Sequence, residues 1–242
     1  MFKAVKLFAI IGGFAMCAAG MSAKADLITN GNFEQTTNGP GKMGTISGAT
    51  TNATGWTSTG YNFIFSATGG DNNSYLQLWG AQNGGAAGNT LGASPDGGNY
   101  IGADGAFQTG PISQVITGLV AGQQYSVGFD YAGAQQSGFS GDTSEKWIVN
   151  LGNNAATAQS TPILNDVSHG FTGWNHEVFT FTADGSSDTL SFLASGTPNG
   201  EPPFSLLDGV TINAVPEPAS MLLMGTGLAA LGLVRRRRRA AQ

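Results

Sequence analysis

Cysteine is nearly absent from this chain of 242 residues, which contains only Cys17. A single cysteine excludes an intramolecular disulfide framework, so the fold must be stabilised by its hydrophobic core. Cys17 also lies in an apolar N-terminal stretch that we expect to be removed, and Met16 stands where a lipidated cysteine needs a small residue before it. We therefore predict neither thiolate chemistry nor a lipid anchor in the mature protein.

Basic side chains are almost as scarce in the central part of the chain. Eight of the ten lie in the first 24 residues or in a run at positions 235–239, so only Lys42 and Lys146 remain between residues 26 and 214. That stretch holds 14 acidic residues, which gives it a formal net charge of −12. Such a domain repels nucleic acid and anionic lipid, and we predict no nucleic-acid partner.

Catalytic motifs are also missing from the sequence. It contains no nucleophile elbow, phosphate-binding loop or zinc-binding helix motif, and its two histidines, His169 and His176, form no metal pair. Glu145, Glu177 and Glu201 could supply two carboxylates for glycoside hydrolysis, but any domain of this size has such acids. We therefore predict that the protein is not an enzyme.

The N-terminus has the pattern of a secretory signal peptide. Lys3 and Lys6 precede an apolar stretch at residues 7–19, and small residues, Ala23 and Ala25, follow at the −3 and −1 positions of a cleavage site. We predict a signal peptide over residues 1–25 and a mature protein that begins at Asp26.

The C-terminus combines three features in a fixed order. Pro216, Glu217 and Pro218 form an extended joint, because proline fixes φ and lacks an N–H. Residues 219–234 carry no charge, and as a helix they would span about 24 Å, slightly less than a bilayer core. The positive-inside rule places the final cationic run on the cytoplasmic side. This run consists of Arg235, Arg236, Arg237, Arg238 and Arg239.

Together these parts resemble the PEP-CTERM sorting signal of Gram-negative bacteria, at residues 215–242. The alternative is an ordinary tail anchor with a proline hinge. The resemblance implies that the inner membrane holds the protein until an exosortase cuts near Pro216 and releases or re-anchors it at the cell surface or outside the cell. Hosts of this system usually make an exopolysaccharide matrix, so the resemblance also implies exopolysaccharide as a partner.

Between the two ends, short apolar alternations of period two are separated by turns rich in Gly, Asn, Ser and Thr. Such alternations predict about nine or ten strands and no amphipathic helix, which favours one all-β sandwich over residues 26–214. The tight connection at residues 120–123 predicts a hairpin between the strands at 112–119 and 125–131. The other strands are predicted at residues 27–28, 61–66, 74–80, 146–151, 176–182, 189–194 and 204–212.

Several short motifs in this domain resemble the galactose-binding-like jelly roll, which family 4 carbohydrate-binding modules share. They are the run at residues 30–34 (NGNFE), Gly55-Trp56, the series Ser113-Gln114, Gly118-Leu119, Gly122 and Tyr125, and the run at residues 207–210 (LDGV). The resemblance implies a jelly-roll-like β-sandwich. Much of residues 95–208 is also similar to the ectodomains of other PEP-CTERM proteins.

The same resemblance implies a structural calcium ion that ties the first strand to the last. The matching residues are Glu34 and Asp208, whose carboxylate oxygens suit a hard cation. Gly209 replaces a second acid that the family often has, which removes one ligand. The alternative is that both acids bond backbone amides. No other cofactor is predicted, and Asp104, in a glycine-rich turn, is expected to stabilise its loop.

Sugar binding requires exposed aromatic rings together with amides or carboxylates. We predict Trp174, Tyr131 and Gln114 as ligand contacts, because Trp174 lies in a loop-like stretch and Tyr131 at a strand end. Trp56 is assigned to the core. The wider set of candidates comprises Tyr61, Trp79, Trp147, Gln135 and Gln136.

These observations lead to one hypothesis with two alternatives. The hypothesis is a non-catalytic surface or matrix protein of a biofilm that binds exopolysaccharide. The first alternative is a structural or protein-binding ectodomain without glycan affinity, and the second is a polysaccharide-modifying enzyme.

Overall fold

The computed structural model describes residues 27–67, 76–216 and 225–227. The predicted signal peptide with Ala23 and Ala25, the motif residues Glu217 and Pro218, and the arginine run 235–239 lie outside these ranges. Pro216 is exposed and has no regular structure. Of the predicted helix at 219–234, only residues 225–227 are described, and they are helical and exposed. Among the described residues, no helix is both long and apolar enough to cross a bilayer.

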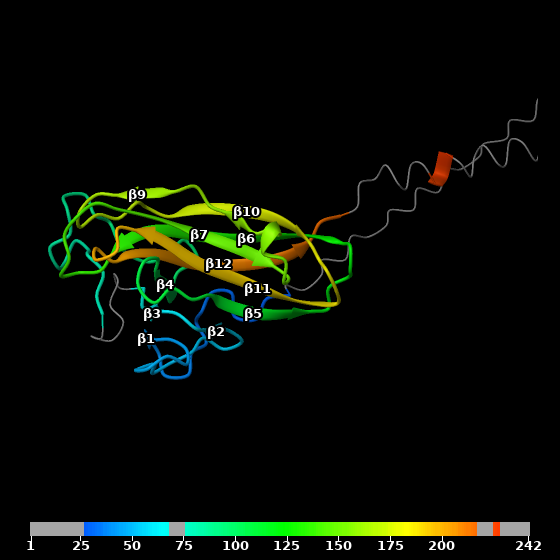
Figure 1. Ribbon diagram of the computed structural model, residues 1–242, viewed down its shortest axis with the longest axis horizontal. Coiled ribbons are helices and arrows are strands. Elements are labelled where there is room, and N and C mark those ends of the chain that lie inside the picture. Colours follow the sequence, from blue (N-terminus) through cyan, green and yellow to red (C-terminus); the bar gives the residue numbers. More distant parts are fainter. Residues whose placement is uncertain (1–26, 68–75, 217–224, 228–242) are drawn as a thin grey trace, which may run out of the picture.

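The described chain folds into two antiparallel sheets packed face to face (Figure 1). The first sheet has the order β1 (Gly41–Lys42), β3 (Asn62–Phe65), β4 (Tyr100–Asp104), β12 (Pro203–Ala214), β6 (Gln124–Gln135) and β10 (Asn175–Thr182). The second has the order β2 (Thr57–Ser58), β5 (Ile112–Thr117), β11 (Ser187–Thr197), β7 (Thr143–Leu151) and β8 (Gln159–Ser160). Strand β9 (Leu164–Asp166) also pairs with β7, and a short 3-10 helix, η1 (Ala155–Thr157), precedes β8.

The main core fills the space between the two sheets. Strand β7 illustrates how a strand contributes to this core, because every second residue along it is buried. At the centre, the ring of Phe192 lies 5.2 Å from that of Phe129 and 6.1 Å from that of Trp147, edge to face in both cases. The Trp147 indole Nε1 donates a 2.8 Å hydrogen bond to the carbonyl oxygen of Leu206 in the opposite sheet. Packing and this bond together fix the distance between the sheets.

A second core covers the outer face of the first sheet at one end of the sandwich. It contains residues of β3, β4, β6 and β12, such as Phe65, Tyr100 and Phe204, and is closed by Leu78 and Leu91 from the segment 76–91. Strand β4 is therefore buried along its whole length, and so is the first half of β12. Strands buried on both faces lose the alternation that a half-exposed strand shows.

The all-β sandwich predicted from the sequence is confirmed, and Trp56 lies in its core. The predicted hairpin is wrong. Strand β5 pairs with β2 and β11, whereas β6 pairs with β12 and β10, so the connection crosses from one sheet to the other. The Tyr125 hydroxyl accepts a 3.0 Å hydrogen bond from the backbone N–H of Val120 and holds this crossing.

Other elements also differ from the expectation. Residues 27 and 28 form no strand, and the described part of the stretch 74–80 makes only an isolated bridge, between Leu78 and Gln136. The two-residue strands β1 and β2 have no apolar alternation, and no pattern in the sequence predicted them.

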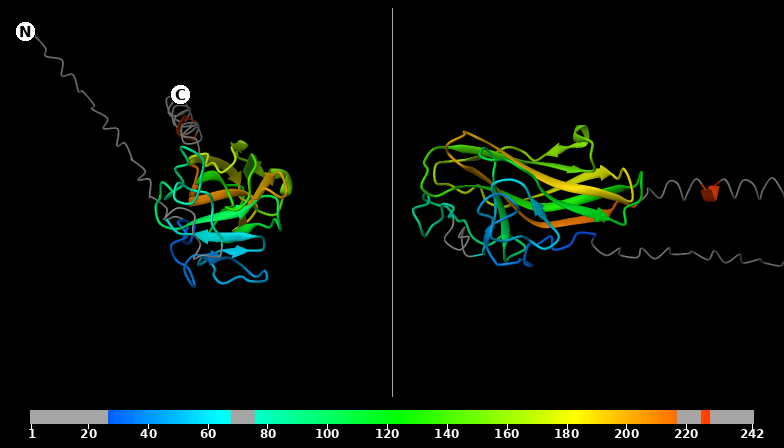
Figure 2. Two further views of the ribbon diagram at one scale, coloured as in Figure 1. Left: turned by 90° about the vertical axis from the view of Figure 1, so that its left-hand side faces the viewer. Right: turned by 60° about the horizontal axis from the view of Figure 1, so that its bottom comes forward.

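The sandwich has two distinct ends. Strand β12 begins opposite Gln135, the last residue of β6, and runs along the whole molecule to Ala214, beyond which the chain continues to residue 216. At about 3.3 Å per residue, its 12 residues span close to 40 Å. The loops that follow β6 and precede β12 therefore lie at the end remote from the C-terminal segment (Figure 1). Residues 27–60 lie along one side of the sandwich (Figure 2), where β1 pairs with the first sheet and β2 with the second. Within the described residues, all members of both core clusters fall between residues 27 and 214.

The bond between the sheets can be tested by substituting Trp147→Phe. Phenylalanine keeps most of the apolar contact but leaves the Leu206 carbonyl without its partner, and a small void forms. We expect a loss of about 2–4 kcal/mol in the free energy of unfolding of residues 26–214, measured by urea denaturation. The control is Val115→Thr on the exposed side of β5, which should change the stability by less than about 0.5 kcal/mol. An equal effect of the two substitutions would contradict this role of Trp147.

Candidate functional site

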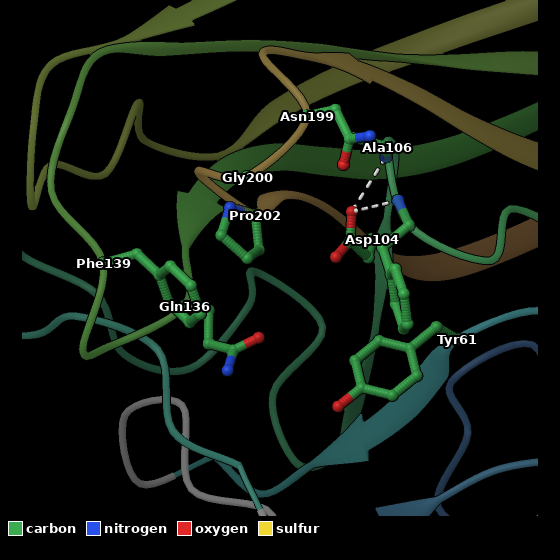
Figure 3. A pocket seen from close by; sticks show the side chains of 9 residues that line it. Tyr61, Asp104, Ala106, Gln136, Phe139, Asn199, Gly200 and Pro202 are labelled. Carbon is green, nitrogen blue, oxygen red and sulfur yellow. Dashed lines mark hydrogen bonds between the residues drawn. The ribbon is translucent and has the colours of Figure 1, made fainter.

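A cavity of about 240 Å³ opens at the end of the sandwich remote from the C-terminal segment (Figure 3). Three loops, the residue before β3 and the last residue of β4 form it. The loops are 105–111 between β4 and β5, 136–142 between β6 and β7, and 198–202 between β11 and β12. The lining residues are Tyr61, Asp104, Ala106, Phe107, Gln136, Phe139, Asn199, Gly200 and Pro202.

Among the described residues of this lining, Asp104 is the only one with a carboxyl group. Its side chain is 2% exposed, and its Oδ1 accepts hydrogen bonds from the backbone N–H groups of Ala106 (2.8 Å) and Phe107 (3.0 Å). Its Oδ2 is buried and has no hydrogen-bond partner within the described part of the chain. Burial raises the pKa of Asp104, and the two backbone N–H groups lower it by less. A buried acceptor without a partner is costly, so the cavity favours a ligand that supplies a donor.

Two exposed aromatic rings flank this carboxyl group. Phe107 is 48% exposed and Phe139 is 40% exposed, although both are large apolar side chains. The ring of Tyr61 meets that of Phe107 edge to face, with centroids 5.2 Å apart. Figure 3 shows the Tyr61 ring on the same side of the cavity as the Asp104 carboxyl group, with Gln136, Phe139 and Pro202 facing them from the other side.

Backbone contacts hold the cavity walls in place. The Tyr61 N–H donates to the carbonyl of Gln108 (2.9 Å), and its carbonyl accepts from the Asp104 N–H (3.2 Å). The backbone of Gly105 bonds to both strands that flank the third loop. Its N–H donates to the carbonyl of Pro203 (2.8 Å), and its carbonyl accepts from the N–H of Gly196 (2.9 Å). A Cβ atom at position 105 would lie 2.5 Å from the Gly196 nitrogen, so only glycine allows this approach.

The loop that carries Phe139 is anchored from outside the cavity. The Trp79 Nε1 donates to the Phe139 carbonyl (2.8 Å), and Ser140 Oγ lies 2.7 Å from His169 Nε2 in a hydrogen bond. The rings of Trp79 and His169 stack with centroids 4.1 Å apart. His169 has a φ of +63°, and its N–H donates to Gln135 Oε1 (2.7 Å). These contacts order the loop before any ligand arrives, which lowers the entropic cost of binding.

The three predicted ligand contacts lie elsewhere. Tyr131 is almost fully buried in the main core. Trp174 packs on the second core, with its ring 5.5 Å from that of Tyr100. Gln114 is buried and exchanges two 2.8 Å hydrogen bonds with the backbone of Thr29, which ties the N-terminal segment to β5.

Of the wider set of candidates, Tyr61 and Gln136 line the cavity, Trp79 and Gln135 support it from behind, and Trp147 lies in the core. Sequence reasoning did not single out Phe107 or Phe139. Each is an isolated aromatic residue in a polar, glycine-containing loop, and this context is the sequence feature that could have indicated an exposed ring. Asp104 was expected only to stabilise its loop, which it does through Oδ1.

The structure brings Glu34 and Asp208 into one cluster of oxygen atoms. Asp208 is fully buried where β12 bulges, and Ser94 Oγ donates to its Oδ2, whereas its Oδ1 has no partner among the described residues. Burial, together with the charges of Asp96 and Glu34, raises the pKa of Asp208 to about 8. Glu34 Oε1 accepts a hydrogen bond from the Asn99 N–H. The Glu34 carboxylate also packs so closely against Gly98 that a Cβ atom at position 98 would collide with it.

This cluster fits the chemistry of calcium. It holds several oxygen donors, an unpaired buried carboxylate oxygen and an excess of negative charge that a cation would relieve. In the described ranges, no three Asp, Glu, His or Cys side chains are arranged to hold a metal ion by themselves. A calcium ion would therefore rely on Glu34 and Asp208 together with hydroxyl or backbone carbonyl oxygens, for which Ser94 is the nearest side chain.

A third group of acids is buried beside β7. Glu145 points into the sandwich against Gly133 of β6, is 1% exposed and has no hydrogen-bond partner for either oxygen within the described chain. Burial, and then the charge of Asp166, raises its pKa to about 9. Burial, and then the charge of Asp142, raises the pKa of Asp166 to about 7. Glu145 is therefore a neutral carboxylic acid at pH 7.

Comparison with protein families gives two matches. The profile described as "PEP-CTERM protein-sorting motif" matches residues 214–239, and the profile described as "Protein of unknown function (DUF642)" matches residues 26–213. No curated protein matches the chain. The sorting motif predicted from the sequence is confirmed, and it implies export and processing by an exosortase.

Solved structures with similar folds come from different functional classes. A cyclase from Fischerella sp. TAU in complex with 4-(1H-indol-3-yl)butan-2-one is 13% identical, with 79% of this chain and 97% of that chain covered and a TM-score of 0.50. TmCBM61 in complex with beta-1,4-galactotriose is 13% identical, with 79% and 100% covered and a TM-score of 0.40. The CBM22-1 xylan-binding domain of Paenibacillus barcinonensis Xyn10C is 15% identical, with 81% and 98% covered and a TM-score of 0.38. The first likeness concerns the fold alone, and we draw nothing further from the other two.

The buried acid Glu145 predicts how stability depends on pH. Its pKa is about 9 in the folded protein and 4.5 ordinarily, so its contribution to stability is complete below pH 4.5 and is lost as the pH rises towards 9. The free energy of unfolding of the Glu145→Gln protein should therefore rise relative to that of the unsubstituted protein as the pH rises, by up to about 1.4 kcal/mol per pH unit.

Urea denaturation of both proteins at pH 5, 7 and 9 measures this difference. Val115→Thr, on the exposed side of β5, removes no titratable group; it is the control and should leave the pH profile unchanged. The assignment of a buried neutral acid is wrong if the profile of Glu145→Gln follows that of the unsubstituted protein.

Proposed function

We propose that this chain, which belongs to the DUF642 family, is an exported surface or matrix protein that binds a carbohydrate in the cavity around Asp104. In this proposal the protein is not an enzyme, and its ligand is an exopolysaccharide of the biofilm. One observation carries the proposal: two exposed phenylalanine rings flank a buried carboxylate oxygen that has no described partner.

The chemistry of a sugar ring matches this lining. Its C–H face is apolar and stacks on aromatic rings, and its hydroxyl groups are hydrogen-bond donors that satisfy a carboxylate. Phe107 and Phe139 offer the first kind of surface and Asp104 Oδ2 the second. The amides of Gln136 and Asn199 line the same cavity and can both donate and accept.

The position of the cavity suits a protein sorted through its C-terminus. The sorting motif begins at residue 214, where β12 ends, and the cavity lies where β12 begins. An anchor at the C-terminus would hold the sandwich with the cavity directed away from the membrane, where a polymer of the matrix can reach it.

A non-catalytic role agrees with the arrangement of the acids. Glycoside hydrolysis uses two carboxyl groups that face each other across the substrate. In the described part of the lining Asp104 is alone, and Glu145 lies inside the sandwich rather than at the cavity surface.

The edge of the first sheet supports a second candidate function. Strand β10 is an eight-residue edge strand with an exposed Val178, and such an edge can accept a strand from another chain. A structural protein that assembles through β10 would oligomerise without any glycan, which sedimentation analysis would detect.

We also propose that calcium binds at Glu34 and Asp208 and stabilises the fold. A ligand at 100 times its dissociation constant adds about 2.7 kcal/mol to stability, which corresponds to a rise of roughly 5–10 °C in the melting temperature of a domain of this size. The rise should appear on adding calcium to chelated protein and should disappear in Asp208→Asn and in Glu34→Gln. The control Asp184→Asn, at an exposed turn, should keep it, and an unchanged response in Asp208→Asn would place the ion elsewhere.

The glycan-binding proposal is tested with residues 26–214 on a broad panel of polysaccharides, followed by titration calorimetry. We expect saturable binding to one polysaccharide class. Phe139→Ala should weaken that binding about tenfold, because the stacking surface is lost. Val115→Ala, at a more exposed apolar position away from the cavity, should leave the binding unchanged. Absence of binding by a folded domain would rule the proposal out and favour assembly through β10.

A further inference from the structure

We propose that the sugar unit held in the cavity carries an ammonium group, so that the glycan is a polymer of amino sugars that are not N-acetylated. This inference rests on the proposed function, because it names the class of ligand for the same cavity. Three features of the lining favour a positive charge.

The first feature is the state of Asp104. Its Oδ1 is already satisfied by two backbone N–H groups, whereas its Oδ2 is buried without a described partner. A neutral ligand that closes over this group would remove the remaining water and leave a carboxylate charge without a counter-ion, which is costly. A ligand ammonium group supplies both the donor and the opposite charge.

The second feature is the pair of exposed rings. A cation is attracted to the face of an aromatic ring, and the attraction grows when the cation is desolvated. Phe107 and Phe139 line the cavity with Asp104 and have no polar atom of their own, so each adds attraction for a cation without competing for it.

The third feature is the lack of a cation within the lining. The polar side chains there, apart from Asp104, are those of Tyr61, Gln136 and Asn199, which are neutral. The nearby ammonium group of Lys42 lies 4.9 Å from the centre of the Tyr61 ring and donates to the Ser47 carbonyl, and Lys42 is not a lining residue. No described cationic side chain of the lining therefore neutralises the Asp104 carboxylate, which leaves that role to a proton or to a cationic ligand.

The two kinds of ligand differ in how they exchange protons with the protein. Burial already raises the pKa of Asp104. A neutral sugar would raise it further, so binding would take up protons and strengthen as the pH falls. An ammonium group would lower it, so binding would release protons and weaken below the pKa of Asp104.

Titration calorimetry of residues 26–214 distinguishes these cases with three oligosaccharides of equal length. They are a glucosamine hexamer, an N-acetylglucosamine hexamer and cellohexaose, measured at pH 4.5 and 6 in buffers of different ionisation enthalpy. We expect the glucosamine hexamer to bind at least tenfold more tightly than the other two at pH 6, with an advantage that shrinks, and proton release that grows, as the pH is lowered towards the pKa of Asp104.

Two substitutions test the origin of the preference. Asp104→Asn keeps an acceptor for the backbone N–H groups, so the loop is retained, but it removes the charge and should abolish the preference. Phe139→Leu keeps an apolar side chain without a ring face and should lower the affinity for the glucosamine hexamer several-fold. Asp142→Asn, an exposed acid on the Phe139 loop outside the lining, should change neither.

The outcomes separate the inference from the proposed function. Equal or tighter binding of the acetylated or neutral hexamer overturns the ammonium inference and leaves carbohydrate binding intact. Binding of none of the three, and of no panel polysaccharide, overturns both. If tetramethylammonium displaces the glucosamine hexamer and binds with the same affinity, the cavity is a quaternary ammonium site and the amino-sugar assignment is overturned.

Discussion

The contact between Trp147 and Leu206 determines how the rest of the molecule is arranged. The chain has no disulfide to hold its two sheets together, and the indole N–H reaches the backbone of β12 from the opposite sheet. Leu206 lies only a few residues after the loop that carries Asn199 and Pro202. The same bond that fixes the spacing of the sheets therefore fixes one wall of the cavity.

Much of the fold follows from the sequence because a half-buried strand has a period of two. Strands β7 and β11 show this alternation clearly, and both were predicted in part. The pattern does not say whether two consecutive strands are neighbours in one sheet or face each other across the core, since the same residues are buried in both cases. That ambiguity produced the wrong hairpin at 112–131. The second core also escaped prediction, because its cover, residues 76–91, has almost no regular structure.

The candidate site was less predictable than the fold for a related reason. An aromatic residue in a β-sandwich serves the core or the surface according to contacts with distant segments. Tyr131 and Trp174 are covered by neighbours that their own sequence does not reveal, whereas Phe107 and Phe139 remain exposed. Asp104 looks like an ordinary turn residue, and it becomes a candidate binding group only because a loop almost 100 residues later in the chain helps to bury it.

A shortage of cations connects the separate acidic groups. The domain has two lysines and fourteen acids, and the lysine with a described side-chain partner, Lys42, is engaged by Ser47 and Tyr61. Buried carboxyl groups in such a domain must hold a proton or take a cation from outside. Glu145, enclosed within the sandwich, keeps its proton. Asp208 and Asp104 each have a buried oxygen without a partner among the described residues, and there the proposed calcium ion and the proposed charged ligand would supply the missing positive charge. The scarcity of basic residues, which excluded nucleic acid at the level of sequence, thus also shapes which ligands the folded domain can bind.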